Sequence, residues 1–275
     1  MTIFRRSCLV AASLGLAAAL TSFSSASAAE KVECTLIIDA KSGETILRKG
    51  TCDQQFYPQS TFKLPLAMMG YDAAILKNAN APLWQYKAEY NRSKREQKDT
   101  MPSIWLSDSI VWYSQEITRK LGRDAFGKYV RDFGYGNMDV SGGPGGTDGL
   151  TESWLMSSLK ISPDEQVAFL KRFLDGQLPI SAEAVEKTKN AAPTFKGNAD
   201  WHIVGKTGSG SMRNSTGKSD PNRPIGWFVG WAHGQQRSVI FARLLVDTKR
   251  HTDKPISFTV RDSMIRDLPK IVDKR

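Results

Sequence analysis

The order of apolar and polar positions predicts strands near both ends of the chain and helices between them. Alternating patterns bounded by turn residues predict two strands within residues 32–48, and further strands at 201–206, 225–232 and 237–246. Apolar residues spaced three and four apart predict helices at residues 60–77, 103–121, 123–133, 163–175 and 256–272. Strands at both ends with helices between them indicate a discontinuous, two-part architecture.

This order predicts an α/β protein of the α+β type, in which an antiparallel sheet is flanked by terminal helices and carries an inserted all-helical region. Residues 30–59 and 195–275 would form the sheet region, and residues 60–194 would form the helical region. Together they would make a single catalytic unit over residues 29–275. We expect a site at the junction of the two regions.

The first 28 residues are predicted to be a secretory signal peptide. Arg5 and Arg6 form a basic start, the 13 residues Cys8–Leu20 are apolar, and Ala26–Ala28 fits a cleavage site of small residues. That apolar run is too short to span a bilayer, and no later run is long enough, so no membrane anchor is expected. The mature protein is expected to be periplasmic or secreted, with general and twin-arginine export both open.

The net charge of +10 falls to +8 once residues 1–28, which carry two arginines and no acidic residue, are removed. The basic residues are scattered, and the densest run, residues 87–98, also contains Glu89 and Glu96. Because aromatic residues are not interleaved with them, we expect no nucleic-acid partner and only some steering of anionic substrates. The three histidines lack metal-ligand spacing, which predicts no metal site.

Two cysteines remain in the mature chain, and export would place them in an oxidising compartment. A hairpin turn centred on Gly43 puts Cys34 and Cys52 nine residues away on either side, so they would face one another in an antiparallel register. We therefore predict a disulfide between them, which would add roughly 2–4 kcal/mol of stability. Two free buried thiols are the alternative.

The tetrapeptide Ser60–Lys63 has the pattern of a nucleophile and its base on one turn of helix. Residues three apart share a helical face, so the Lys63 amine can reach the Ser60 hydroxyl and take its proton. A capping serine and a surface lysine are the structural alternatives. Lowering the pKa of a lysine to 7 costs roughly 4.6 kcal/mol. Burial could supply this free energy, or the amine could be converted into a different base. The same spacing recurs at Ser157 and Ser215, so the pair gains weight from the motifs that follow it.

Two further motifs lie in the predicted helical region. In Ser109–Val111, Ser109 could relay a proton while Val111 shields the base, or the segment could simply pack within an apolar helix. In Tyr135–Asn137, Tyr135 and Asn137 are candidate substrate contacts, although glycine followed by asparagine is also typical of a turn.

Lys206–Gly208 follows a β-type run near the end of a predicted strand. Lys206 and Thr207 would hold a carboxylate, and Gly208 would let a substrate approach the strand closely. Trp154 is either core or a hydrogen-bond donor that holds a catalytic group. Arg261 could form a second contact with a carboxylate.

Together these motifs resemble the class D (oxacillinase-type) serine β-lactamases. The resemblance runs from about Cys34 to the C-terminus and includes residues 149–154 and 226–230. It implies a serine β-lactamase/transpeptidase-like fold and a resistance enzyme that opens the β-lactam ring of penicillin-type antibiotics. Ser60 would attack the lactam carbonyl, and water would then hydrolyse the acyl-enzyme.

The resemblance also implies a role for each candidate residue. Lys63 would act as the base in its N-carboxylated form, derived from carbon dioxide, and Trp154 would hydrogen-bond that carbamate. No other cofactor is implied. The backbone amides of Ser60 and Ser209 would form the oxyanion hole. Three side chains would hold the substrate carboxylate: Lys206, Thr207 and Arg261.

A β-lactam sensor domain and a penicillin-binding transpeptidase are the competing interpretations, because both are acylated without efficient turnover. Sensors resemble class D enzymes but are attached to transmembrane regions, and transpeptidases usually carry further domains or an anchor. The expected secreted form favours hydrolysis. The sequence predicts neither the substrate spectrum nor the oligomeric state.

Overall fold

The computed structural model describes residues 30–143, 148–197 and 201–273, so the predicted signal peptide lies outside the described residues. Within these ranges the centre of the fold is a six-stranded antiparallel sheet with the order β2-β1-β6-β5-β4-β3. The strands are β1 (Val32–Asp39), β2 (Thr45–Gly50), β3 (Thr194–Lys196), β4 (His202–Arg213), β5 (Ser219–His233) and β6 (Ser238–Val246). Because β1 pairs with β6, the two ends of the chain share one sheet, which confirms the predicted fold class.

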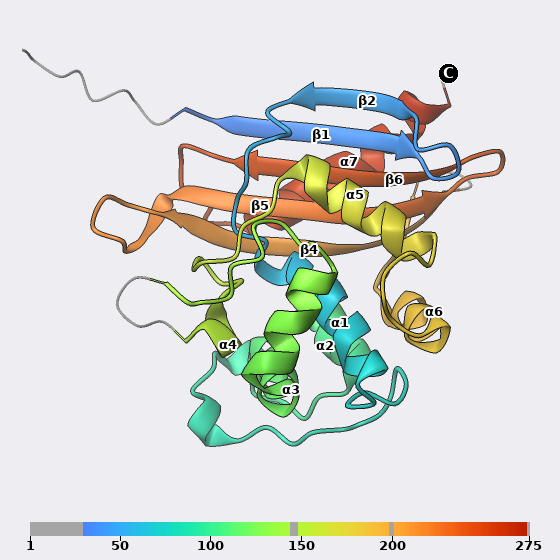
Figure 1. Ribbon diagram of the computed structural model, residues 1–275. Helices are drawn as coiled ribbons and strands as arrows, with labels where there is room; N and C mark the ends of the chain where they lie inside the picture. Colours follow the sequence, from blue (N-terminus) through green and yellow to red (C-terminus); the bar gives the residue numbers. More distant parts are fainter. Residues whose placement is uncertain (1–29, 144–147, 198–200, 274–275) are drawn as a thin grey trace, which may run out of the picture.

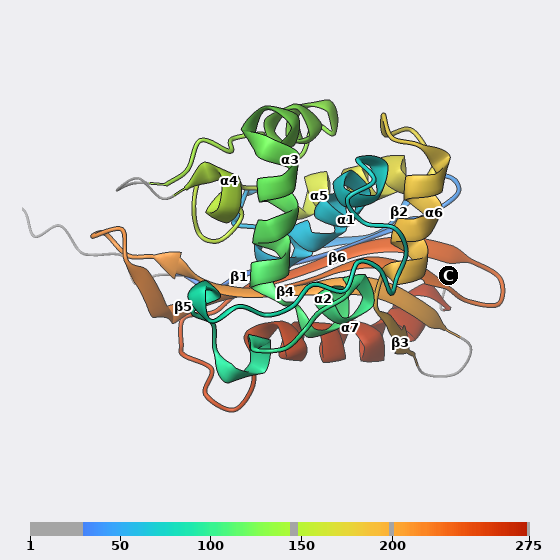
Figure 2. The same cartoon turned by 90° about the horizontal axis from the view of Figure 1, so that it is seen from below.

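The two faces of the sheet are covered by different helices (Figures 1 and 2). α7 (Ile256–Val272) lies along one face, where Val260 and Met264 pack with Phe228 and Phe241 of the strands. α5 lies across the opposite face, on the side that also carries α1 and α3 (Figure 2). Successive side chains of a strand point to opposite faces, so the strands contribute to two separate apolar layers.

The helices of the inserted region lie between β2 and β3 in the chain. They are α1 (Lys63–Asp72), α2 (Pro102–Asp108), α3 (Val111–Asp132), α4 (Gly149–Glu152), α5 (Pro163–Leu174) and α6 (Ala182–Ala191). Short 3₁₀ turns occur at Gln59–Phe62, Ala88–Tyr90 and Lys94–Glu96. None of the helices in the described ranges is long and apolar enough to cross a membrane.

α5 and α7 lie where the periodicity predicted them, to within one residue at each end. α5 begins at a capping box, in which Ser162 and Glu165 each bond the backbone N–H of the other. α5 packs against the sheet, at β1, β5 and β6, although its residues were predicted to belong to the helical region. α6 was not predicted, because its buried face consists largely of small residues such as Ala184 and Ala191.

The predicted continuous helix over residues 103–121 is wrong, because the chain breaks at Ser109. α2 ends at Asp108, Ser109 adopts the left-handed conformation (φ 61°, ψ 40°), and α3 starts at Val111. The predicted boundary near residue 122 is confirmed, because Gly122 has a non-helical backbone (φ 77°, ψ 162°) that kinks α3 at this position. Apolar spacing continues across the break, so the pattern could not reveal one left-handed residue.

The predicted disulfide is present, but the register used to predict it is wrong. Cys34 lies opposite Gly50 in the β1–β2 pair, not opposite Cys52. Cys52 follows the end of β2, and the chain reaches it through a positive φ of 87° at Gly50, whose Cα lies close against the Glu33 carbonyl. The two cysteine Cα atoms are then 5.2 Å apart and the sulfurs are bonded.

Candidate active site

The predicted nucleophile and base lie at the start of α1, next to β4. Ser60 belongs to a 3₁₀ turn, Gln59–Phe62, that continues directly into α1 at Lys63. Residues three apart are aligned in such a turn. Lys63 Nζ donates a hydrogen bond to Ser60 Oγ at 3.2 Å. Lys63 is completely buried, whereas Ser60 keeps some exposed surface.

Burial lowers the pKa of Lys63 well below its ordinary value. The positive charge of Lys206 lowers that pKa further, with smaller contributions from Arg95 and Arg92, and Glu96 acts in the opposite direction. Desolvation disfavours the charged amine, so burial favours the neutral form. A neutral Lys63 amine can accept the proton of the Ser60 hydroxyl.

A second lysine and serine meet beside the first pair, although they are far apart in the chain. Lys206 Nζ, on β4, donates a hydrogen bond to Ser109 Oγ at 3.0 Å and another to the Thr207 carbonyl at 3.2 Å. Burial, followed by the positive charge of Arg95, lowers the pKa of Lys206 to about 7. The left-handed backbone of Ser109 gives its hydroxyl this position between α2 and α3.

β4 runs directly past the turn that carries the nucleophile. A Cβ atom on Gly208 would lie 2.9 Å from the Pro58 carbonyl oxygen and 3.2 Å from the Ser60 amide nitrogen. Only a residue without a side chain allows this approach. The Ser60 amide therefore lies beside the edge of β4 that leads into Ser209.

Trp154 lies behind the nucleophile in an aromatic cluster. It is completely buried and stacks on Phe62, with ring centroids 5.4 Å apart, and its carbonyl accepts the Gln59 N–H at 3.1 Å. Its indole Nε1 is also buried, and none of the described residues offers it a hydrogen-bond acceptor. Val111, which was expected to shield the base, is the first residue of α3 and is partly buried.

The structure gives Tyr135 a different place from the expected substrate contact. Tyr135 has no exposed surface, and its hydroxyl donates to Gln166 Oε1 at 3.4 Å. Gln166 Nε2 in turn donates to Thr61 Oγ1 at 2.9 Å, which braces the residue after the nucleophile. Sequence reasoning missed Gln166, although a glutamine on the apolar stripe of α5 is a detectable signal.

Asn137 is likewise engaged with the backbone of a neighbouring loop. Its side-chain amide donates to the Ser158 carbonyl and its oxygen accepts the Lys160 N–H, both at 2.9 Å. The Asn137 N–H donates to the Lys160 carbonyl at 2.9 Å. These bonds fix the turn that was the alternative interpretation of Tyr135–Asn137.

Arg261 does not join Lys206 and Thr207. Its guanidinium is paired with Asp262 at 2.7 Å and lies over the rings of Phe258 and Phe195. From α7, the side chain of Ser257 hydrogen-bonds to Ser209 of β4.

Ser209 Oγ donates to Ser257 Oγ at 2.7 Å and accepts the Ser257 N–H at 3.2 Å. A small serine in the first turn of a helix carries no sequence signal, so Ser257 was missed.

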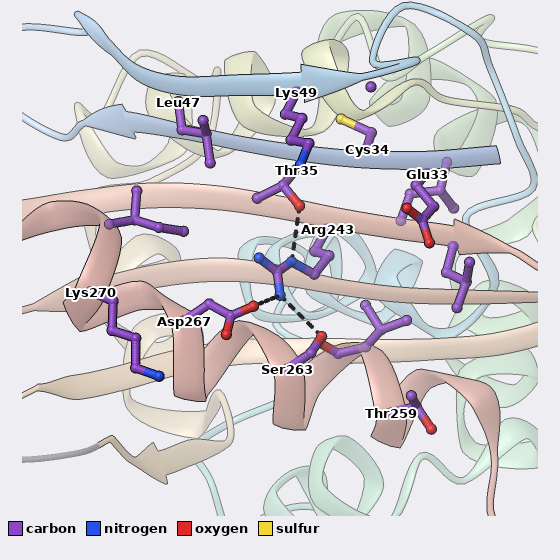
Figure 3. A pocket seen from close by; sticks show the side chains of 15 residues that line it. Glu33, Cys34, Thr35, Leu47, Lys49, Arg243, Thr259, Ser263, Asp267 and Lys270 are labelled. Carbon is purple, nitrogen blue, oxygen red and sulfur yellow. Dashed lines mark hydrogen bonds and ion pairs between the residues drawn. The ribbon is translucent and has the colours of Figure 1, made fainter.

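A pocket of about 730 Å³ lies on the opposite side of the molecule, between α7 and strands β1, β2 and β6 (Figure 3). In it, Arg243 donates to Thr35 Oγ1 at 3.0 Å, to Ser263 Oγ at 3.0 Å and to Asp267 at 2.8 Å. The two hydroxyls therefore face a guanidinium, which cannot act as a base. Among the described residues, no group of three or more His, Cys, Asp or Glu side chains could hold a metal ion.

Comparison with known proteins agrees with this geometry. The model of the penicillin-binding protein transpeptidase domain family matches residues 12–266. Beta-lactamase OXA-9 of Klebsiella pneumoniae is 45% identical over 248 residues, which cover 90% of this chain and 90% of that protein. Beta-lactamase OXA-1 of Escherichia coli is 38% identical over 200 residues, covering 72% of this chain and 70% of that protein.

The solved structure of the OXA-427 class D beta-lactamase has a TM-score of 0.81 to this chain and is 40% identical to it. The alignment covers 88% of this chain and 99% of that one. The family model over residues 12–266 and the similarity to these relatives place the chain in the penicillin-binding protein transpeptidase-domain family. Within that family, it belongs to the class D β-lactamases.

Proposed function

We propose that this protein hydrolyses β-lactam antibiotics through an acyl-enzyme on Ser60. The observation that carries the proposal is the contact between Ser60 Oγ and the Nζ of a buried Lys63, at 3.2 Å. Lys63 takes the hydroxyl proton while Ser60 Oγ bonds to the lactam carbonyl carbon. The backbone amides of Ser60 and Ser209 stabilise the developing oxyanion.

Ser109 and Lys206 are proposed to protonate the leaving nitrogen of the lactam ring. When the carbon–nitrogen bond of the ring breaks, Ser109 Oγ gives its proton to that nitrogen, and Lys206 replaces it. This sequence is supported by the 3.0 Å hydrogen bond from Lys206 to Ser109. After acylation, Lys63 releases the proton that it took, and Lys206 regains one from the solvent. Water then attacks the ester carbonyl and gives its proton to Lys63, which passes it to Ser60 Oγ as the ester bond breaks, so that Ser60 leaves as the free hydroxyl.

The substrate carboxylate is proposed to bind beside β4. Lys206 and Thr207 contribute a positive charge and a hydroxyl, and the linked hydroxyls of Ser209 and Ser257 extend this polar edge. Arg261 is assigned no direct part, because its guanidinium is paired with Asp262. Tyr135 is proposed to support the nucleophile turn through Gln166, and Asn137 is proposed to hold the neighbouring loop at Ser158 and Lys160. Neither is proposed to contact the substrate.

We further propose that Lys63 is N-carboxylated in the active enzyme. The neutral amine that burial favours is the form that reacts with carbon dioxide, and Trp154 offers a buried indole N–H without an acceptor among the described residues. Such a carbamate supplies a base suited to neutral pH. Trp154 would hold it in place, and Phe62 would fix the indole by stacking.

Export to the periplasm or the medium is proposed from the N-terminal sequence pattern. The Cys34–Cys52 disulfide supports it, because disulfides persist in oxidising compartments.

The nucleophile is tested by intact-mass spectrometry of the purified protein during penicillin turnover. We expect a transient adduct that maps to Ser60 and disappears when the substrate is consumed, and no adduct in Ser60→Ala. Ser215→Ala is the matched control, because it removes a serine with the same spacing to a lysine from an exposed turn. An adduct that persists indefinitely would identify a β-lactam sensor instead of a hydrolase.

The carbamate is tested with ¹³C-labelled bicarbonate. We expect a carbamate signal in the NMR spectrum that is absent in Lys63→Ala, and loss of activity at acid pH that added bicarbonate restores. Trp154→Phe keeps the stacking surface but removes the N–H, so it should lose deacylation more than acylation and depend more strongly on bicarbonate. Absence of the signal, with no effect of bicarbonate on either protein, would rule the carbamate out.

A further inference from the structure

The hydroxyl of Ser109 depends on a strained break between two helices. Ser109 has a positive φ of 61°, which is unfavourable for a residue with a side chain. The residue that caps α3 is Ile110, whose side chain cannot accept a hydrogen bond from the first N–H groups of the helix. Something other than this local sequence must therefore hold the start of α3.

Glu96 supplies that acceptor from a distant part of the chain. Its carboxylate Oε2 accepts the N–H of Val111 at 2.7 Å, and its backbone carbonyl accepts the indole N–H of Trp112 at 2.9 Å. Glu96 is 7% exposed, which is unusual for a glutamate without a dedicated partner. A negative charge at this position also complements the dipole of the first helical part of α3, residues 111–121.

The neighbours of Glu96 hold the other side of the break. Arg95 donates a hydrogen bond to the Asp108 carbonyl, and Lys98 Nζ lies 2.8 Å from the Asp108 carboxylate. Asp108 immediately precedes Ser109, and Val111 follows it by two residues. The segment 95–98 thus contacts the chain on both sides of Ser109.

We propose that Glu96 is a positioning residue of the active site, whose carboxylate fixes the start of α3 and thereby holds the Ser109 hydroxyl in line with Lys206. Glu96 touches neither the substrate nor the reacting atoms, and its role rests on the proposed function because it acts through Ser109. A displacement of about 1 Å at a catalytic group can reduce the rate about 100-fold. The hydrogen bond to Val111 is therefore part of what makes Ser109 competent to transfer a proton.

The proposal is tested by a double-mutant cycle between Glu96 and Ser109, with kcat and KM measured per folded molecule at a temperature below unfolding. We expect Glu96→Ala to lower kcat by about 10- to 100-fold with a smaller change in KM. In the Ser109→Ala background the same change should have almost no further effect. Glu96→Gln retains an acceptor for Val111 and should recover most of the lost kcat.

Glu89→Ala is the matched control, because Glu89 is an exposed acid close to Glu96 in the chain and, within the part of the chain that the structure describes, forms an ion pair with Lys87 alone. If Glu96→Ala does not fold, Glu96→Asp keeps the charge but withdraws the acceptor, and the same cycle is run with it. Additive losses in kcat, or a normal kcat in a destabilised Glu96 variant, would overturn the positioning role. If Ser109→Ala alone left turnover intact, the proton relay of the proposed function would fail first, and Glu96 would lose its role with it.

Discussion

At the scale of single residues, the site depends on two lysines that are buried without a carboxylate hydrogen-bond partner. Lys63 and Lys206 are 0% and 2% exposed, and each donates to a serine hydroxyl. Burial disfavours their charged forms, and the positive charge of Lys206 further lowers the pKa of Lys63. The same desolvation therefore favours the proposed role of Lys63 as a base and lowers the pKa of Lys206 to about 7.

The first prediction concerns the pKa of Lys206, which burial lowers to about 7. As pH rises through this value, Lys206 loses its charge and with it part of its attraction for the substrate carboxylate. KM for a penicillin should therefore rise above pH 7, approaching about tenfold per pH unit. Steady-state kinetics between pH 6 and about 9 measure it.

Two controls separate this effect from other titrations. The methyl ester of the same penicillin lacks the carboxylate, so its KM should change little over this range. Lys206→Arg keeps its charge at every pH tested and should flatten the KM profile. A rise of equal size for the ester would contradict the role of Lys206 in carboxylate binding.

At the scale of elements, the site is formed where β4 passes the 3₁₀ turn that precedes α1. The turn presents Ser60 and its amide, and β4 presents Lys206, Thr207 and Ser209. Their separation is set by Gly208, which lies against the Pro58 carbonyl. The backbones of β4 and of the turn are therefore in contact beside Ser60.

The second prediction is that Gly208→Ala impairs catalysis more than folding. The added methyl would lie 2.9 Å from Pro58 O and 3.2 Å from Ser60 N, so β4 must move away from the turn. We expect kcat/KM to fall by about 10- to 100-fold. The free energy of unfolding should fall by about 1–3 kcal/mol, the usual cost of overpacking.

Gly210→Ala provides the comparison, because it adds the same methyl two residues further along β4. There the three atoms nearest to the methyl all belong to the side-chain end of Gln59, and none is a backbone atom of the turn. Its effect on kcat/KM should be clearly smaller, as measured by parallel kinetics and urea unfolding. Equal losses in the two variants would show that the spacing at Gly208 has no special importance.

At the scale of the whole molecule, the sheet contains strands from both ends of the chain. The proposed catalytic residues and the disulfide lie at different strands of this sheet. The disulfide links β1 to the segment after β2, near one edge of the sheet. Lys206 lies on β4, and β6 and β5 separate that strand from β1. A change at the disulfide should therefore reach the site only through global stability.

The third prediction is that replacing both Cys34 and Cys52 by serine lowers the free energy of unfolding by about 2–4 kcal/mol and leaves kcat unchanged. Urea unfolding and penicillin turnover of the folded protein measure the two quantities. Dithiothreitol should destabilise the natural protein to a similar degree and have no effect on the double variant. A loss of kcat in the folded double variant would show that the hairpin and the site are coupled.

The features that the sequence by itself determined follow from the spacing of residues along the chain and from the number of cysteines. Ser60 and Lys63 lie three residues apart, so any helical turn brings them together, whether α or 3₁₀. The strands, α5 and α7 follow from periodic burial of one face. The partners in the disulfide were predictable because only two cysteines are expected in the mature chain, although the register was not.

Only the tertiary structure decided the features that depend on contacts between distant segments. Ser109 reaches Lys206 through a left-handed residue that apolar spacing cannot reveal, and Glu96 caps α3 across 15 positions of sequence. The burial of Tyr135 and the position of the Arg261 guanidinium over the Phe195 ring likewise depend on how complete elements pack. Periodicity and spacing report which face of an element is buried, whereas the environment of a side chain is set by the elements that cover that face.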